Sequence, residues 1–377
     1  MTPSFEALRL ASARIYQAPG RVNLIGEHTD YNDGFVMPAA IDLFTYAAIK
    51  LRDDRTLSIH SENFSESVEF ELDQPAPRAR GHWADYVWGV AVMIERAGYK
   101  LRGADLTIKS DVPIGAGLSS SAAIEVTAGL ALLDNSGFEI DRVELAKLCQ
   151  KAENEFVGMR CGIMDQFISC NAQAGTALIL DCRSLEFRLL PIPENVRLVI
   201  CNTMVKHELG SSEYNTRRAE CEAGVKYFAK LLPNIRALRD VSIEDFDRFG
   251  AGLSELIYKR CRHVITENAR VLEAAVALER NDLTGFGELM AESHRSLRDD
   301  YEVSCGELNI MVDLATSVEG VYGARMTGGG FGGSTINLVK TESVADFKQI
   351  VASGYLNATG VTPEILVCAA ATGATRV

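Results

Sequence analysis

A short polar segment near the start of the chain carries side chains that suit sugar recognition. Residues 18–33 (APGRVNLIGEHTDYND) include an apolar run that can anchor them in a core, and Gly26 permits a close backbone approach. Carboxylates and an imidazole at this spacing can hydrogen-bond several hydroxyls of a sugar or polyol, although a solvated, turn-capping loop has the same composition. The polar side chains of this candidate sugar site are Arg21, Glu27, His28 and Asp30.

A Gly- and Ser-rich turn at residues 113–123 (PIGAGLSSSAA) precedes a helical pattern. The N-terminus of a helix presents free N–H groups and a partial positive charge, so such a turn can bind phosphate. No lysine follows as in a Walker A loop, and the third glycine of GxGxxG is missing. A Ser-rich N-cap after a flexible turn is the alternative. The candidate phosphate loop consists of Gly115, Ala116, Gly117, Leu118, Ser119, Ser120 and Ser121.

Glu153 occupies the apolar stripe of a helix expected over residues 141–157. It follows Ala146 and Cys149 at spacings of three and four residues, which places all three on one face. A carboxylate there is costly to bury unless it is paired with a cation or a metal. Exposure at the helix edge is the ordinary alternative, but a hard-cation ligand that faces the phosphate loop fits the pattern better.

Asp165 stands among apolar neighbours in residues 158–169 (GMRCGIMDQFIS), which predicts a largely desolvated carboxylate. A helix N-cap or a buried pair with an arginine would explain it structurally. An aspartate held beside a sugar hydroxyl can instead orient that hydroxyl and accept its proton during phosphoryl transfer. Asp165 is therefore a candidate general base.

A second Gly-rich element lies at residues 323–334 (GARMTGGGFGGS). It has too many adjacent glycines for a plain hairpin turn, although close packing of two core elements would also require small residues. The pattern favours a backbone that passes close to a ligand or to another loop.

The composition is that of a globular protein with an acidic surface. The 377 residues are 47% hydrophobic and 24% charged, and the length is sufficient for two domains. A net charge of −13 argues against a nucleic-acid partner but not against a nucleotide substrate. No run of about 18 apolar residues occurs, so we expect a cytoplasmic protein without a membrane partner. The nine cysteines are scattered, and Cys149, Cys161 and Cys201 are expected to be small buried hydrophobes in a reducing compartment.

Strand and helix patterns alternate without a regular βαβ order, which predicts an α+β fold rather than a doubly wound sheet. Strands are expected at residues 68–72, 105–110, 196–203 and 334–339, and helices at 119–133, 141–157, 211–232 and 262–280. Pro191 and Pro193 interrupt the chain before the strand at 196. We therefore expect one domain over residues 1–195 and another over residues 196–377.

These motifs resemble those of the galactokinases, a family of the GHMP small-molecule kinase superfamily. The similar segments are residues 20–32 (GRVNLIGEHTDYN), the phosphate loop, residues 211–218 (SSEYNTRR), residues 292–304 (ESHRSLRDDYEVS) and the second Gly-rich element. The resemblance implies a two-lobed α+β fold with the active site in the cleft between the lobes. It also implies ATP-dependent phosphorylation of α-D-galactose at the anomeric hydroxyl, with Mg²⁺ as the cofactor.

The resemblance also implies a role for each candidate residue. Asp165 corresponds to the catalytic base, and Arg21 to the group that stabilises this carboxylate and the developing phosphate charge. The residues similar to sugar contacts are Glu27, His28, Asp30, Gly162 and Tyr214. Ser121, with Ser120 as a near alternative, and Glu153 correspond to the Mg²⁺ ligands. Trp83 and Tyr86 fall where the family places aromatic residues near adenine, although a pair at this spacing is also common in a helix core.

Two other functions remain open from the sequence. The chain resembles kinases closely enough that N-acetylgalactosamine, arabinose or galacturonate could replace galactose as the substrate. A non-catalytic galactose sensor is the second alternative, but such sensors are expected to be shortened within residues 119–123, which are intact here. Asp33 and Phe35 flank the first motif where related chains vary, and Arg160 adds a positive charge just before the segment of Asp165; either feature can shade the sugar preference. We expect galactose and ATP as the small-molecule partners, and a monomer or weak dimer.

Overall fold

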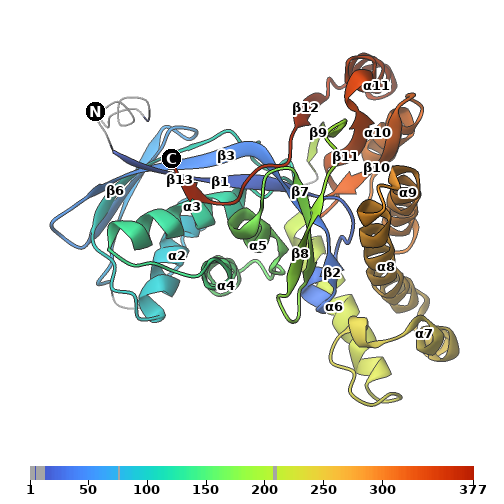
Figure 1. The fold of residues 1–377 in the computed structure, drawn as a ribbon. Helices are drawn as coiled ribbons and strands as arrows, with labels where there is room; N and C mark the ends of the chain where they lie inside the picture. Colours follow the sequence, from blue (N-terminus) through green and yellow to red (C-terminus); the bar gives the residue numbers. More distant parts are fainter. Residues whose placement is uncertain (1–4, 6–12, 75–76, 207–209) are drawn as a thin grey trace.

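The first of two lobes is built on a six-stranded sheet (Figure 1). The computed structural model describes residues 5, 13–74, 77–206 and 210–377. All neighbouring strands pair antiparallel except β4 and β6, which are parallel. In sheet order, the strands are β13 (Thr375–Arg376), β1 (Arg14–Asn23), β3 (Pro38–Leu51), β6 (Ala104–Ser110), β4 (Thr56–Ser61) and β5 (Glu66–Glu71).

Four helices cover one face of this sheet, the lower face in Figure 1. They are α2 (Asp85–Arg96), α3 (Ser120–Asn135), α4 (Arg142–Ala152) and α5 (Met164–Asn171). Helix α4 begins where the Asp141 side chain accepts hydrogen bonds from the backbone N–H groups of Val143 and Glu144. Trp88, Leu133 and other apolar side chains form the core between these helices and the sheet. A small sheet of β2 (Phe35–Val36), β7 (Thr176–Asp181) and β8 (Phe187–Pro191) leads toward the second lobe.

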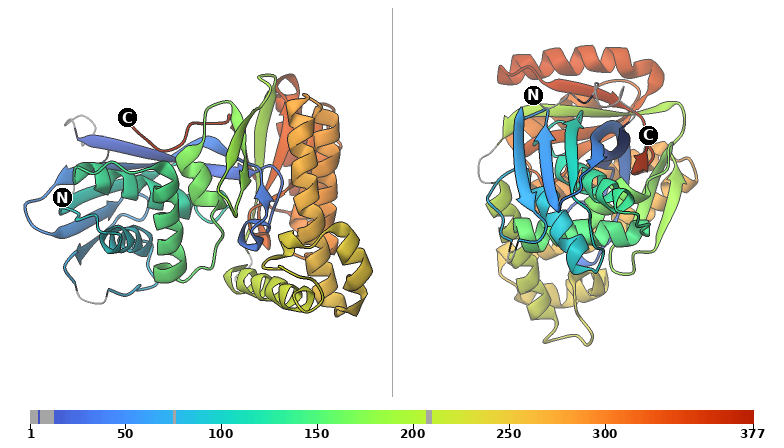
Figure 2. Two further views of the ribbon diagram at one scale, coloured as in Figure 1. Left: turned by 60° about the horizontal axis from the view of Figure 1, so that its bottom comes forward. Right: turned by 90° about the vertical axis from the view of Figure 1, so that its left-hand side faces the viewer.

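The second lobe contains a four-stranded antiparallel sheet covered on both faces (Figure 2). Its strands, in order, are β10 (Val321–Thr327), β11 (Gly332–Lys340), β9 (Val196–Lys206) and β12 (Glu364–Cys368). Alternate residues of β9 point to opposite faces, as the strand period requires. Leu198 and Ile200 pack with α8 (Glu255–Glu279) and α9 (Leu283–Asp299), whereas Val199 and Cys201 pack with α10 (Gly306–Thr316) and α11 (Val344–Thr359).

Helices α6 (Gly210–Phe228) and α7 (Ile243–Phe249) pack with α8 at one end of the second lobe. Phe228, Phe246 and Tyr301 are buried in the apolar cluster between them. Short helical turns occur at η1 (Asp30–Asn32), η2 (Glu153–Val157), η3 (Leu238–Asp240), η4 (Gly250–Gly252) and η5 (Thr341–Ser343). The first two of these turns carry residues that the sequence analysis singled out.

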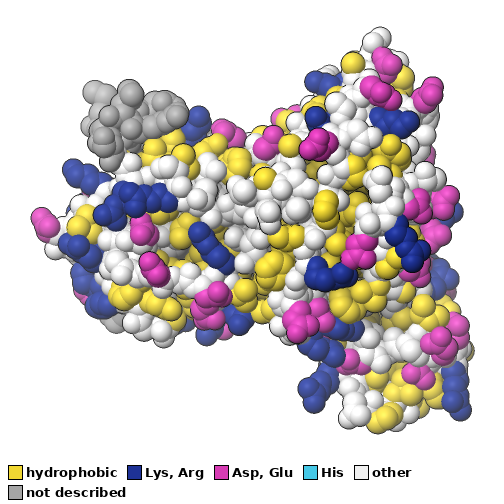
Figure 3. All heavy atoms as spheres, in the orientation of Figure 1, with side chains coloured by type: hydrophobic (Ala, Val, Ile, Leu, Met, Phe, Trp, Pro, Cys, Tyr) yellow, Lys and Arg dark blue, Asp and Glu magenta, His cyan; other side chains and the backbone are white. Residues whose placement is uncertain are grey.

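The last described residues return to the first lobe. Strand β13 pairs with β1, so that residues 375 and 376 lie in the first sheet although they follow the second lobe in sequence. On the face of the molecule in Figure 3, acidic and basic side chains are interspersed over both lobes. Within the described ranges, no helix is long and apolar enough to cross a membrane.

The α+β fold and the predicted elements are confirmed, with shifted boundaries. Residues 18–33 are not all loop, because Arg21 lies in β1, where Val22 pairs with Ala39. The helix predicted over residues 141–157 ends as an α-helix at Ala152 and continues as the π-helical turn η2. Helix α6 ends four residues before the predicted limit of 232, shortly before Pro233 in the sequence, and α8 begins seven residues before 262, after the Ser254 cap.

Gly287 tests the packing of the second lobe. Helix α9 lies so close to β10 that a Cβ atom on Gly287 would be 1.7 Å from the Tyr322 carbonyl oxygen. We expect Gly287→Ala to lower the free energy of unfolding by about 1–3 kcal/mol, because overpacking outweighs the better helix propensity of alanine. Gly306→Ala is the control, since no atom lies within 4 Å of its Cβ position. Urea unfolding curves that show equal stability for the two variants would contradict this packing.

Candidate active site

One cavity of about 310 Å³ brings together most of the candidate residues from distant parts of the chain. Side chains come from strand β1, from residues 23–33 at and after its end (here called the sugar loop), from the phosphate loop, and from η2, α5 and α6. The lining residues predicted from sequence are Arg21, Glu27, His28, Asp30, Gly115, Gly117, Leu118, Ser119, Ser120, Ser121, Glu153, Gly162, Asp165 and Tyr214. Gly328 and Gly329, from the turn between β10 and β11, line the same cavity.

A bidentate ion pair lies at the centre of the site. Arg21 Nε donates to Asp165 Oδ1 and Arg21 Nη2 donates to Asp165 Oδ2, both at 2.8 Å. The third branch of the guanidinium, Nη1, donates to the Gly117 carbonyl at 2.6 Å. Arg21 thereby joins Asp165, the candidate general base, to the phosphate loop. The planar guanidinium presents parallel donors that match a carboxylate, so the pair fixes the orientation of Asp165.

The environment of Asp165 differs from the prediction. Its side chain is 27% exposed, so the expected largely desolvated carboxylate is wrong: the group opens into the cavity. Ser119 Oγ also donates to Asp165 Oδ2. This contact was not foreseen, because the serines were expected to cap the helix, contact phosphate or bind a metal. Ser119 adopts a left-handed conformation with φ +59° just before α3, and makes no side-chain cap.

Asp30 lies in close contact with the backbone of Gly162. A Cβ atom on Gly162 would be 1.9 Å from Asp30 Oδ2, so glycine leaves the space that this carboxylate occupies. Burial and the charge of Asp165 raise the pKa of Asp30 to about 7, although Arg21 and the Tyr31 backbone N–H act in the opposite direction. The Asp30 carboxyl is therefore held close to other acids, and Arg21 compensates their charge only in part.

His28 and Glu27 are buried at the floor of the site. Burial lowers the pKa of His28 to about 3, so the imidazole is neutral; its Nδ1 lies 2.7 Å from the Tyr31 hydroxyl. Its Nε2 is buried without a hydrogen-bond partner of ordinary geometry. Glu27 accepts hydrogen bonds from the Gly328 backbone N–H and the Thr327 hydroxyl. Glu27 thus ties the sugar loop to the second Gly-rich element.

Glu153 is only 5% exposed, as its place on the apolar stripe predicts. Its Oε2 accepts a hydrogen bond of 2.6 Å from Gln166 Nε2, and in the described part of the chain no lysine or arginine pairs with it. Burial and the charge of Asp165 raise its pKa to about 7, which a hydrogen bond from Ser121 opposes. Gln166 Nε2 also donates a hydrogen bond of 3.0 Å to Glu125 Oε2. Glu125 is a buried carboxyl that no sequence motif indicates.

These residues fit a hard cation. A hydroxyl and a carboxylate are oxygen donors of the kind that Mg²⁺ prefers, and a buried carboxylate without a cationic neighbour is suited to receive one. Among the described residues, no group of three or more His, Cys, Asp or Glu side chains has metal-site geometry. This agrees with a site that takes only one or two protein ligands and completes its coordination with phosphate and water.

Trp83 and Tyr86 line a second cavity of about 330 Å³ that shares Gly115, Ser120 and Ser121 with the first. Its other lining residues are four apolar ones, Phe64, Ile108, Ile114 and Ile124, and four polar ones, Thr45, Ser61, Asn63 and Ser110. Trp83 stacks on Phe64 with ring centroids 5.6 Å apart, and its indole N–H donates to Glu66. The phosphate loop therefore separates a polar cavity from an aromatic one.

Some residues differ from their predicted place. Ala116 does not line either cavity; it is buried, and its carbonyl accepts a hydrogen bond from Ser334. Cys161, expected to be a buried hydrophobe, is half-buried and lines the cavity beside Met159. Cys149 and Cys201 are buried as predicted, and all nine cysteines are free thiols. A Cβ atom on Gly328 would lie 2.9 Å from the Gly117 carbonyl oxygen. This confirms the predicted close approach of the second Gly-rich element to another loop.

Three family models match the chain. The galactokinase galactose-binding signature matches residues 4–51, the GHMP kinases N terminal domain matches residues 85–173, and the GHMP kinases C terminal model matches residues 274–354. The first match covers the segment that contains Arg21, Glu27, His28 and Asp30, and the second covers the phosphate loop, Glu153 and Asp165.

Known proteins are similar over nearly the whole chain. A galactokinase of Chloroflexus aggregans is 50% identical over 360 residues, which cover 96% of this chain and 92% of that protein. The crystal structure of Lactococcus lactis galactokinase complexed with galactose has a TM-score of 0.94 at 39% identity, with 97% of this chain and 95% of that chain covered. A mevalonate kinase structure, at 20% identity and a TM-score of 0.68 over 94% and 98% of the two chains, shows the shared fold.

The pKa of Asp30 gives a direct test of the site geometry. In ligand-free protein labelled at the Asp carboxyl carbons, we expect one resonance, absent in Asp30→Asn, to titrate near pH 7. Gly162→Ala should displace the carboxylate and move this midpoint down toward the ordinary value of about 3.9. A wild-type midpoint near 4, or no change on placing a methyl group at residue 162, would contradict the contact described here.

Proposed function

The chain belongs to the galactokinase family, and from this premise we propose that it transfers the γ-phosphoryl group of ATP to the anomeric hydroxyl of galactose in the cavity around Asp165. The observation that carries the proposal is the position of Asp165. Its carboxylate opens into a cavity lined by the sugar loop on one side and by the phosphate loop on the other. A base at this point lies between the two substrates that the reaction must join.

Asp165 retains capacity to act on a hydroxyl. A carboxylate offers about four lone-pair positions, and three are used by the two Arg21 donors and by Ser119. The remaining position can accept the proton of the anomeric hydroxyl as its oxygen attacks phosphorus. The bond between C1 and its oxygen is never broken, so the product keeps the α configuration. Arg21 holds the base in place and lies where negative charge develops on the transferred group.

The sugar would be held by two buried groups, Glu27 and His28, and by two partly buried ones, Asp30 and Tyr214. Glu27, His28 and Asp30 offer acceptors and donors in fixed positions, and Tyr214 closes the cavity from helix α6. A buried polar group left unpaired by the wrong sugar carries the full cost of its desolvation. This supports strong discrimination of galactose from glucose, which differs only in the configuration at C4.

The nucleotide would extend from the phosphate loop into the aromatic cavity. The N-terminus of α3 and the glycine backbone face the phosphates, and Trp83 and Tyr86 offer apolar surface to the adenine. Ser121 and Glu153 would hold Mg²⁺. When bound, this ion neutralises charge on the phosphates. Free thiols throughout the chain support a reducing, cytoplasmic location. We also propose a monomer or weak dimer.

A panel of sugars tests the function. ADP release with Mg²⁺-ATP is measured for galactose, glucose, N-acetylgalactosamine, arabinose and galacturonate, and the product is identified by NMR. We expect galactose to have the highest kcat/KM, by about four to five orders of magnitude over glucose, and to yield α-galactose 1-phosphate. Equal values for glucose and galactose would overturn the substrate assignment, and sugar binding without ADP release would identify a sensor.

Asp165→Asn should abolish most turnover while it leaves folding and galactose binding nearly intact. Asparagine keeps the size of the side chain but cannot accept the proton, so kcat should fall by about two to four orders of magnitude. Single-turnover phosphate transfer and a separate galactose binding titration measure the two properties. Asp247→Asn, at an exposed position of α7 far from the cavity lining, is the control. A variant at position 165 that keeps most of its kcat shows that the proton leaves by another route.

Glu153→Ala should raise the Mg²⁺ concentration needed for half-maximal activity about tenfold or more, and lower kcat, with little effect on galactose binding. Glu155→Ala removes an exposed carboxylate from the same helical turn and should leave metal dependence unchanged. Mg²⁺ titrations of both variants at saturating ATP make the comparison. Normal metal dependence combined with higher stability in Glu153→Ala would show that residue 153 is no ligand.

A further inference from the structure

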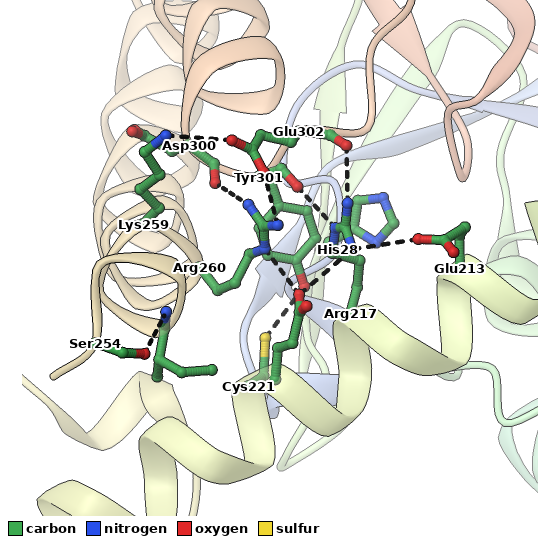
Figure 4. Close-up of polar contacts among 12 residues, drawn as sticks. His28, Glu213, Arg217, Cys221, Ser254, Lys259, Arg260, Asp300, Tyr301 and Glu302 are labelled. Atoms are coloured by element: carbon green, nitrogen blue, oxygen red, sulfur yellow. Dashed lines mark hydrogen bonds and ion pairs between the residues drawn. The ribbon is translucent and has the colours of Figure 1, made fainter.

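Two segments that resemble galactokinases, residues 211–218 and residues 292–304, contribute only Tyr214 to the cavity lining described above. Residues 211–218 form part of α6. Residues 292–304 form the end of α9 and the segment of residues 300–304 that follows it, which we call the strap. Figure 4 shows that they meet at Tyr301, whose ring lies beside the His28 imidazole. The contacts around Tyr301 indicate why the chain keeps both segments.

Buried arginines fix the backbone of this strap. Arg217 Nε donates to the Tyr301 carbonyl at 2.8 Å, and its Nη2 donates to the Glu302 carbonyl at 3.0 Å. Arg260 Nη1 donates to the Asp300 carbonyl at 2.6 Å. Both guanidinium groups are buried, and Figure 4 shows them converging on the strap from α6 and α8. The position of Tyr301 is therefore set by charge-assisted hydrogen bonds rather than by packing alone.

A chain of hydroxyl contacts runs from Tyr301 to the sugar cavity. The Cys221 thiol lies 3.1 Å from the Tyr301 hydroxyl, which lies 2.8 Å from the Tyr31 hydroxyl, which in turn lies 2.7 Å from His28 Nδ1. The rings of His28 and Tyr301 are also in contact, with centroids 4.8 Å apart. Except for Tyr31, which is partly buried, these side chains are buried. Each of these four side chains thus has the next one in the series as a hydrogen-bond partner.

The chemistry of the two ends indicates the direction of the hydrogen bonds. A neutral imidazole nitrogen is a good acceptor, whereas a thiol sulfur is a weak one. The favourable order is therefore for Cys221 to donate to Tyr301, Tyr301 to Tyr31, and Tyr31 to His28 Nδ1. The hydrogen bond at one imidazole nitrogen decides which nitrogen carries the proton. The nearby Gly329 backbone opposes the effect of burial on the pKa of His28, as an acceptor near a ring N–H does, but it forms no hydrogen bond of ordinary geometry with Nε2.

We propose that Tyr301 is a positioning residue for galactose recognition: through Tyr31 it holds His28 as the Nε2–H tautomer, with this N–H directed at a sugar hydroxyl. His28 Nε2 is buried without an ordinary partner, and the side chain lines the cavity, as a donor reserved for a ligand requires. The inference rests on the proposed function only in that the ligand is galactose. It adds a residue that touches neither substrate nor metal but sets how one sugar contact is presented.

The first test compares single hydroxyl deletions. Tyr301→Phe keeps the ring and removes only the donor to Tyr31. We expect the KM for galactose to rise about threefold to tenfold, the loss of roughly one hydrogen bond, while kcat and the KM for ATP stay within about twofold. Tyr227→Phe is the control, because its hydroxyl bonds to the Phe249 carbonyl in the same apolar cluster but has no link to His28. Equal changes of the KM for galactose in both variants would show that Tyr301 has only a structural role.

A double-mutant cycle tells failure of this inference from failure of the proposed function. If Tyr301 acts through His28, adding Tyr301→Phe to His28→Ala should raise the KM for galactose no further. Fully additive effects overturn the positioning role. An unchanged KM in His28→Ala instead removes His28 from the sugar site and so contradicts the proposed function.

The tautomer can be measured without turnover. In ligand-free protein labelled with ¹⁵N-histidine, we expect His28 to show a pyrrole-like Nε2 and a pyridine-like Nδ1, and Tyr31→Phe to produce a mixture of tautomers. The His28→Ala spectrum assigns the resonances. A pyrrole-like Nδ1 in the wild type would overturn the proposed direction of the chain.

Discussion

The pair of hydrogen bonds between Arg21 and Asp165 is the constraint on which the site depends. It joins β1 to α5 across 144 residues of sequence and, through the Gly117 carbonyl, also sets the phosphate loop. A bidentate pair tolerates little rotation of either side chain. The sheet that carries Arg21, the helix that carries Asp165 and the turn before α3 must therefore be placed together before any of them can serve catalysis.

The sequence was informative wherever a property depends on near neighbours. The helix start at residue 141, the turn before α3 and the place of Glu153 on an apolar stripe follow from local pattern and are predicted from it. Contacts across long separations were not, because no local pattern encodes them: the Ser119–Asp165 bond and the Tyr31–Tyr301 contact, 270 residues apart, are examples. The exposure of Asp165 and Cys161 was misjudged for a related reason, since apolar neighbours in sequence do not reveal a cavity on the remaining side.

The second lobe shapes the sugar site although it supplies few of its side chains. Arg325 donates to the Asn23 carbonyl, Glu267 accepts from the Gly26 N–H, and Gly328 donates to Glu27. Each contact joins a buried polar group of the second lobe to the sugar loop of the first. A buried polar atom left unpaired is costly, so the loop has little freedom once the lobes have met. The site is thus preorganised by the junction itself.

The return of the chain to its first sheet has a consequence for biosynthesis. Residues 373 and 374 donate backbone hydrogen bonds to Ala172 and Ser169 at the end of α5, and β13 then covers β1 beside Tyr16 and Gln17. Helix α5, which carries Asp165, and strand β1, which carries Arg21, are both held by residues that follow the whole second lobe in sequence. During translation the first lobe therefore emerges early but lacks this edge strand until the second lobe has also been synthesised. In a nascent chain that lacks residues 375 and 376, the edge of β1 at Tyr16 and Gln17 would be left unpaired, in the same strand that carries Arg21.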